Sequence, residues 1–174
     1  MHLEKEFEAL VTQYKTNMYM ICYMYANDKD EANDFFQETL IRLWQGFSQF
    51  RGESNINTWI SRICINTCIS GLRKKKKHSG AVPLSIDLEF LEENNESGKQ
   101  LAQMYRLINK LGVLDKALIL LWLDNMNYAE IAEIMGISVS NVSVKLMRIK
   151  EKLKTMASAA ASDGQCPTFD GLPI

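Results

Sequence analysis

Residues 127–153 read NYAEIAEIMGISVSNVSVKLMRIKEKL, and they predict a short helix, a tight turn and a longer helix. Asn127 and Glu130 have the spacing of a capping box, and Gly136 suits the left-handed end of a helix. Ser138 can cap the longer helix. Such a pair is typical of a helix-turn-helix, although purely structural bundles contain it too. The expected inner residues are Tyr128, Ile131, Ala132, Met135, Val139, Val142, Leu146, Ile149 and Leu153.

The rest of the chain also has helical periodicity. Apolar residues recur three and four positions apart, and nothing alternates with period two. This pattern predicts an all-α fold with helices over residues 7–25, 28–47, 58–72, 100–111 and 117–123. The last of these is apolar on every side, so we expect it to be fully buried.

A change in composition separates two halves. Residues 79–98 hold two glycines, a proline and five acids without any basic residue, which is typical of a linker. We therefore expect two small helical domains joined by a flexible linker, the first over residues 1–78 and the second, with the helix-turn-helix, over residues 99–155. Residues 156–174 are expected to form a flexible tail whose alanine-rich start favours helix.

The helices of the first half each have an inner and an outer face. The inner face of the second helix is expected to hold Ala32, Phe35, Phe36, Thr39, Leu40, Leu43, Trp44 and Phe47, and its outer face Asp34, Gln37, Glu38, Ile41 and Gln45. The third helix is expected to turn Ile60, Ile63, Cys64, Thr67 and Cys68 inward and Arg62, Asn66 and Arg73 outward.

The formal net charge of −1 conceals strong segregation. Residues 51–78 carry 7 basic and 1 acidic residue, and residues 139–155 carry 5 basic and 1 acidic residue, whereas residues 1–50 and 79–138 are net acidic. Two basic segments at the ends of helical units favour two contacts with a polyanion. Because both patches are modest, we expect weak, salt-sensitive DNA binding by the chain alone.

Several classes of protein are disfavoured. No long uncharged apolar stretch occurs, and the first 27 residues hold acids rather than a basic region, so neither a membrane span nor a signal peptide is expected. Four irregularly spaced cysteines favour a reducing cytoplasm over a disulfide framework. A zinc site at Cys64, Cys68 and His78 is a weaker interpretation than two small core residues. No catalytic constellation is evident, and no enzyme activity, metal or cofactor is expected.

Several motifs occur along the chain: Asp34-Phe-Phe-Gln37-Glu38-Thr39 with Trp44, Phe50-Arg-Gly-Glu-Ser54, Thr58-Trp59-Ile60, Arg62-Ile-Cys-Ile-Asn66 and residues 127–138. Together they resemble bacterial RNA polymerase sigma factors of the extracytoplasmic-function (ECF) class. The motifs follow one another in the family's order over roughly residues 5–155. One departure is Leu111-Gly112-Val113-Leu114, where many members have Leu-Pro. The resemblance implies a factor that binds core RNA polymerase, directs it to specific promoters and opens the DNA strands.

The resemblance also assigns roles to residues. The outer face of the second helix, with Asp34, Gln37, Glu38 and Ile41, would bind the polymerase. The minus-ten promoter element would be bound by Ser54, Asn55, Asn57, Arg62, Asn66, Arg73 and Lys74, with the polar loop residues holding an unstacked base. The minus-thirty-five element would be bound in the major groove by Ser140, Asn141, Val144, Lys145, Arg148 and Lys152.

Partners and rival interpretations follow from these roles. The family implies an anti-sigma factor that covers the same faces, and no small-molecule substrate is expected. A stand-alone helix-turn-helix repressor is the main rival, in which the face around Asp34 would instead form a dimer interface. A pure interaction module, with both basic segments incidental, is a third interpretation.

Overall fold

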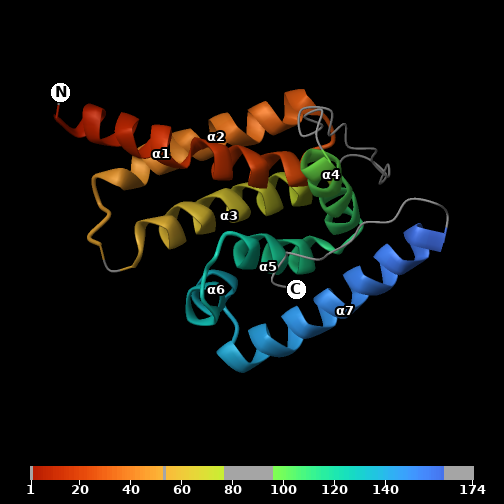
Figure 1. The fold of residues 1–174 in the computed structure, drawn as a ribbon. Helices are drawn as coiled ribbons and strands as arrows, with labels where there is room; N and C mark the ends of the chain where they lie inside the picture. The colour runs from red at the N-terminus through yellow and green to blue at the C-terminus, as the bar shows by residue number, and fades with distance from the viewer. Residues whose placement is uncertain (1, 53, 77–95, 163–174) are drawn as a thin grey trace.

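The computed structural model describes residues 2–52, 54–76 and 96–162, which form seven helices and no strand (Figure 1). The first half comprises α1 (His2–Tyr25), α2 (Lys29–Phe47) and α3 (Ile56–Lys76). The second half comprises α4 (Glu96–Asn109), α5 (Val113–Leu123), α6 (Tyr128–Met135) and α7 (Val139–Ser162). The predicted all-α fold is therefore confirmed, and the helix-turn-helix is formed by α6 and α7.

Local signals set several helix ends where the sequence predicts them. Asp28 caps α2 by accepting a hydrogen bond from the Glu31 backbone N–H at 2.8 Å. Asn127 and Glu130 form the complete capping box of α6. Gly136 ends α6 with φ of 65°, a left-handed conformation that glycine adopts without strain. The Ser138 hydroxyl accepts from the Asn141 N–H at 3.2 Å and so begins α7.

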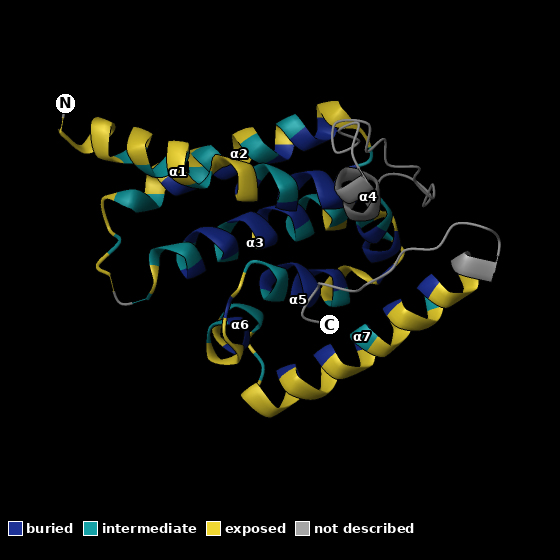
Figure 2. Cartoon of the chain, viewed as in Figure 1, coloured by how far each residue is buried: buried dark blue, intermediate teal, exposed yellow. Residues whose placement is uncertain are grey.

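The core of the first half lies where α1, α2 and α3 meet (Figure 2). Cys64 and Cys68 are fully buried there beside Cys22, whose thiol shares a 3.8 Å hydrogen bond with Thr39. The inward placement of Trp44 is wrong, because its side chain is 43% exposed. Phe7 of α1 packs edge-on against the Trp44 ring, with ring centroids 5.1 Å apart, and leaves much of the indole uncovered.

The second half is built around α5, which is buried on most sides. Around it lie Ile131, Val142, Leu146, Ile149 and Leu153, all buried as predicted. Two predicted core residues are exposed instead, Tyr128 at 36% and Val139 at 49%. Each is the first residue of its helix, where the side chain leans toward the N-terminus and away from the helices that cover later turns.

Two helices extend past the predicted limits of the second domain. Helix α7 continues to Ser162, so residues 156–162 of the predicted tail are helical, and Ala157 is buried. Helix α4 begins at Glu96, inside the predicted linker. Residues 77–95, which include His78 and most of the predicted linker, lie outside the described residues, as do residues 163–174. None of the described helices has the length and apolarity that a membrane crossing requires.

The two halves touch where α3 meets α5 and α6, and also at the end of α1 and the start of α5. The buried Lys116 ammonium donates to the Met24 carbonyl of α1 at 2.8 Å and to the side-chain oxygen of Asn109. It also lies 5.4 Å from the centre of the Tyr25 ring. The Tyr25 hydroxyl donates in turn to the Val113 carbonyl at 2.9 Å. Burial lowers the pKa of Lys116 to about 8, since desolvation disfavours its charged form.

This shift makes stability depend on pH. In the unfolded chain Lys116 has its ordinary pKa of 10.5, so above pH 8 the unfolded chain holds more protons than the folded one. The unfolding free energy of wild type, relative to Lys116→Met, should therefore rise by about 2 kcal/mol between about pH 7.5 and 9.5. Urea titrations at each pH measure it. Lys110→Met, which removes an exposed lysine, should match the wild-type pH dependence; a parallel curve for Lys116→Met would contradict the assignment.

Candidate functional site

Helix α2 presents a face with an apolar centre and an acidic rim. Asp34, Gln37 and Glu38 are all exposed, and Ile41 is 52% exposed. One turn further on, the exposed part of Trp44 extends the apolar centre. The structure thus brings together all four residues predicted for polymerase binding, and adds Trp44, which the helical periodicity placed in the core.

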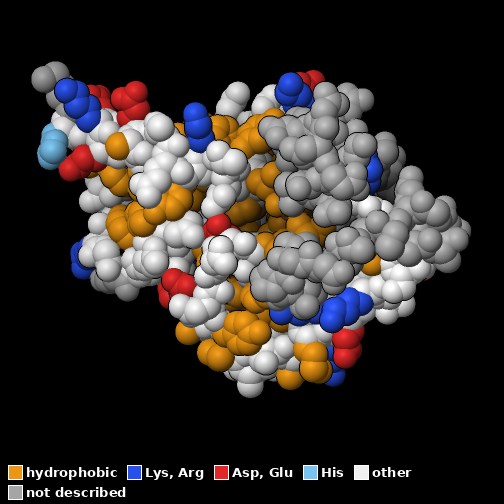
Figure 3. Space-filling model, in the orientation of Figure 1, with side chains coloured by type: hydrophobic (Ala, Val, Ile, Leu, Met, Phe, Trp, Pro, Cys, Tyr) orange, Lys and Arg blue, Asp and Glu red, His pale blue; other side chains and the backbone are white. Residues whose placement is uncertain are grey.

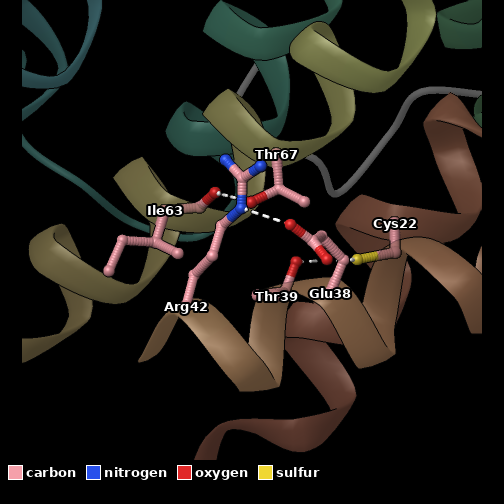
Figure 4. Close-up of polar contacts among 6 residues, drawn as sticks. All are labelled: Cys22, Glu38, Thr39, Arg42, Ile63 and Thr67. Atoms are coloured by element: carbon pink, nitrogen blue, oxygen red, sulfur yellow. Dashed lines mark hydrogen bonds and ion pairs between the residues drawn. The ribbon is translucent and has the colours of Figure 1, made fainter. Parts of the chain in front are cut away.

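The orientation of this face is fixed by the opposite side of the helix. Figure 4 shows Thr39 turned toward Cys22 of α1, while its neighbour Glu38 pairs with Arg42 one turn along α2. The Glu38–Arg42 pair is 2.8 Å long and exposed, so it orders the rim while adding little stability. With Thr39 and Leu43 buried, α2 cannot rotate without exposing its core side.

The loop between α2 and α3 borders a hollow of about 990 Å³. Its aromatic wall is formed by Phe50 and Trp59, whose ring centroids lie 4.9 Å apart. Ser54 lines it, and Arg51 and Arg62 bring positive charge to its edge. Flat rings beside polar and cationic groups can stack on a base and attract a phosphate. Phe50 and Arg51 were missing from the predicted site, although both lie within the motif quoted for the resemblance.

Asn55 and Asn57 shape the loop as it enters α3. The Asn55 side-chain oxygen accepts from the Asn57 backbone N–H at 3.0 Å and so caps the start of α3. The Asn55 carbonyl then accepts from the Trp59 N–H at 3.1 Å. Neither of these asparagines lines the hollow. Ser54, which was predicted to hold the same base, does line it.

The outer side of α3 is only partly free. Asn66, Arg73 and Lys74 are exposed. By contrast, Arg62 donates to the Glu133 carboxylate at 2.7 Å and to the Glu133 carbonyl at 3.0 Å. The start of the predicted minus-ten surface is therefore covered by α6, a contact that no sequence pattern indicated.

Two further polar contacts join the halves beside this pair. The Asn57 amide donates to Asp124 at 2.9 Å, and the Thr58 hydroxyl donates to Glu130 at 3.3 Å. Asp124 also accepts from the Asn17 amide. Burial raises the pKa of Asp124, and the hydrogen bonds from Asn57 and Asn17 offset part of that rise.

Helix α7 exposes one side along its length (Figure 2). That side carries every residue predicted for the minus-thirty-five element: Ser140, Asn141, Val144, Lys145, Arg148 and Lys152. Met147, 54% exposed, was not predicted. Lys150 lies on another side, with its ammonium 3.6 Å from the centre of the Trp122 ring. The helix thus has a polar, cationic outer side on an apolar base.

The exposed face of α2 and the exposed side of α7 lie far apart on the molecule. Helices α2 and α7 occupy opposite sides, with α3 and α5 between them (Figure 1). On the face shown in Figure 3, apolar side chains reach the surface near the middle, between clusters of polar and charged groups. Within the described residues, no group of three or more His, Cys, Asp or Glu side chains is arranged to hold a metal ion.

Comparison with known families accounts for both halves. Residues 10–78 match the family described as Sigma-70 region 2, and residues 101–153 match Sigma-70, region 4. The ECF RNA polymerase sigma-E factor of Escherichia coli (strain K12) is 30% identical, over 86% of this chain and 85% of its own length. SigV of Bacillus subtilis (strain 168) is 27% identical, over 79% of this chain and 82% of its own.

A longer relative and two solved structures complete the comparison. The ECF sigma factor SigG of Mycobacterium tuberculosis is 26% identical over 93% of this chain, which spans about half the length of SigG. The sigma factor RpoE of Bartonella quintana, solved with the anti-sigma factor NepR, has a TM-score of 0.75 at 20% identity, over 87% of this chain and 96% of its own. CnrH, solved with the cytosolic domain of CnrY, has 0.66 at 18%, covering 90% of each chain. Both solved structures share the fold of this chain's two halves.

Proposed function

This chain belongs to the ECF family of RNA polymerase sigma factors, and we propose that it binds core RNA polymerase and directs it to specific promoters. The observation that carries the proposal is the presence of both regions in one chain, each with an exposed face of suitable chemistry. The chain would act on DNA only as part of the polymerase complex, and no reaction of its own is assigned to it. The proposed domains are residues 1–78 and 99–155, and the proposed location is the cytoplasm.

Polymerase binding is assigned to the face of α2. An apolar centre of Ile41 and Trp44 with a rim of Asp34, Gln37 and Glu38 has the composition of a protein interface. The acidic rim favours a partner surface with basic groups. The stand-alone repressor would use this face for dimerisation, but region 2 in the first half supports polymerase binding instead.

Minus-ten recognition is assigned to the hollow and the outer side of α3. A base taken out of its stack would lie against Phe50 and Trp59, with Ser54, Asn55 and Asn57 at the polar loop. Arg62, Asn66, Arg73 and Lys74 would follow the strand along α3. Their guanidinium, amide and ammonium groups suit phosphate and base edges.

Minus-thirty-five recognition is assigned to α7. Residues near the start of a recognition helix reach base edges, and Asn141 can form two hydrogen bonds with adenine. Arg148 and Lys152 lie further along the same helix, where phosphates are nearer. The polymerase would hold both halves at promoter spacing, and so raise their effective concentration at the two elements.

A protein partner of the anti-sigma class is proposed as well. Both solved neighbours are complexes, RpoE with the anti-sigma factor NepR and CnrH with the cytosolic domain of CnrY. A partner of this kind would cover the α2 face or the DNA-binding surfaces in the resting state.

Removing the rim of the α2 face should weaken polymerase binding. The variant Asp34→Ala, Gln37→Ala, Glu38→Ala should lose at least tenfold in affinity for core polymerase lacking any sigma subunit, about 1.4 kcal/mol. Gel filtration of the mixture measures co-elution. The matched control Glu6→Ala, Glu8→Ala, Gln13→Ala removes exposed groups of the same kinds from α1 and should co-elute as wild type does. A folded wild type that failed to co-elute and ran as a dimer would favour the repressor.

Two substitutions on α7 should have different effects on promoter choice. Asn141→Ala should relax the preference at one base position by about 1–3 kcal/mol, because a paired base contact is lost. Lys152→Ala should weaken binding to all sequences alike and reduce the salt dependence, because a phosphate contact is lost. Binding of the polymerase complex to a panel of single-base promoter variants distinguishes them. Equal effects of both substitutions at every position would contradict the assignment.

A further inference from the structure

Three acids of the second half contact the start of α3 in the first half. Asp124, at the end of α5, accepts from Asn57, and Glu130 and Glu133 of α6 accept from Thr58 and Arg62. Two of these partners, Asn57 and Arg62, belong to the proposed minus-ten surface. Glu133 also lines the hollow that holds Phe50 and Trp59.

We propose that this contact is autoinhibitory: in the chain without polymerase, the carboxylates of the second half occupy the donor groups that promoter DNA would use. The proposal rests on the proposed function, because it concerns regulation of the same minus-ten surface. A strand entering the hollow would have to displace Glu133 from Arg62. Its phosphates would also approach Glu133, which lines the hollow, and Asp124 and Glu130 beside it, and like charges at short range repel. Strand binding at the start of α3 and contact with α6 are therefore mutually exclusive.

The contact has the chemistry of a reversible interface. The Arg62–Glu133 pair is partly exposed, with 36% and 50% of the two side chains accessible, so its contribution is small and falls with salt. Asp124 is held by two amides rather than by a cation, so its burial is poorly compensated. Lys116, on the other side of the interface, is held by a carbonyl and an amide oxygen.

The apolar part of the same interface borders a pocket that opens to solvent. This pocket of about 90 Å³ lies between α1 and the second half, lined by Met20 and Ile21 on one side and by Tyr105, Leu120 and Leu121 on the other. Water therefore reaches this edge of the contact between the halves. Polar contacts beside an open apolar edge suit two halves that separate when a stronger partner binds.

The test removes the three charges while preserving the shapes of the side chains. The variant Asp124→Asn, Glu130→Gln, Glu133→Gln keeps the α6 capping box, since glutamine serves at that position. The control Glu6→Gln, Glu8→Gln, Asp30→Asn removes the same charge from exposed positions outside the interface. Each full-length protein, without polymerase, is mixed with a fluorescein-labelled single-stranded DNA of mixed sequence, and anisotropy measures binding.

The triple amide variant should bind this strand about tenfold more tightly than the control, since the carboxylate charges that attract Arg62 and repel phosphates are removed. Its radius of gyration in small-angle X-ray scattering should exceed that of wild type. Equal binding by variant and control would overturn the proposal. Expansion without a gain in binding would overturn it too, because the contact would then not cover the DNA surface.

Exchanging the charges of Arg62 and Glu133 tests the contact between the halves without DNA. Arg62→Glu should expand the free chain, because two carboxylates would face each other, and Arg62→Glu with Glu133→Arg should restore the wild-type radius. If the single and the double variant had the same radius of gyration, the contact would not form in solution and the proposal would be overturned. Polymerase binding by wild type distinguishes the two hypotheses. If wild type did not bind core polymerase, the proposed function would be refuted, while the radii of gyration of the free chains would be unaffected.

Discussion

Burial of α3 on two sides is the constraint on which the arrangement depends. One side, with Ile60, Cys64 and Cys68, packs into the core with α1 and α2. Thr58, Ser61 and Ile65, spaced three and four apart on another side, are also buried, next to Arg62 where α5 and α6 contact the helix. The same helix thus supports the first half, receives the second half and carries the proposed strand-binding side chains. Any motion of the second half therefore changes which side chains of α3 are accessible for the proposed DNA binding.

Much of the fold could be predicted from the sequence because its signals are local. The caps at Asp28, Asn127 and Ser138 and the glycine turn depend on neighbours within four residues. The exposed side of α2 was predictable for the same reason, since a helix with one wide apolar face leaves the other free. The errors at Trp44, Tyr128 and Val139 concern positions at the edge of a face or the end of a helix, where periodicity does not specify how far the neighbouring helix reaches.

The contact between the halves could not be predicted, because it joins polar residues far apart in the chain. Thr58 and Ser61 are small polar residues whose burial depends on a second surface that the sequence pattern does not show. The segregation of charge suggested attraction to DNA, yet the structure places three acids of the net-acidic segment 79–138 on the basic segment 51–78. Alternating blocks of charge thus serve contacts within the chain as well as the proposed contacts with a polyanion.

The stacking of Lys150 on Trp122 has a thermodynamic consequence for α7. A lysine that would otherwise sample many rotamers is held 3.6 Å from the centre of an aromatic ring, on the same helix as the anchors Val142, Leu146 and Ile149. Helix and support therefore form one rigid unit in the free chain. In the proposed recognition of DNA by α7, little backbone entropy would be lost when the outer side chains met the bases, and the ordering penalty would fall mainly on the long cationic side chains themselves.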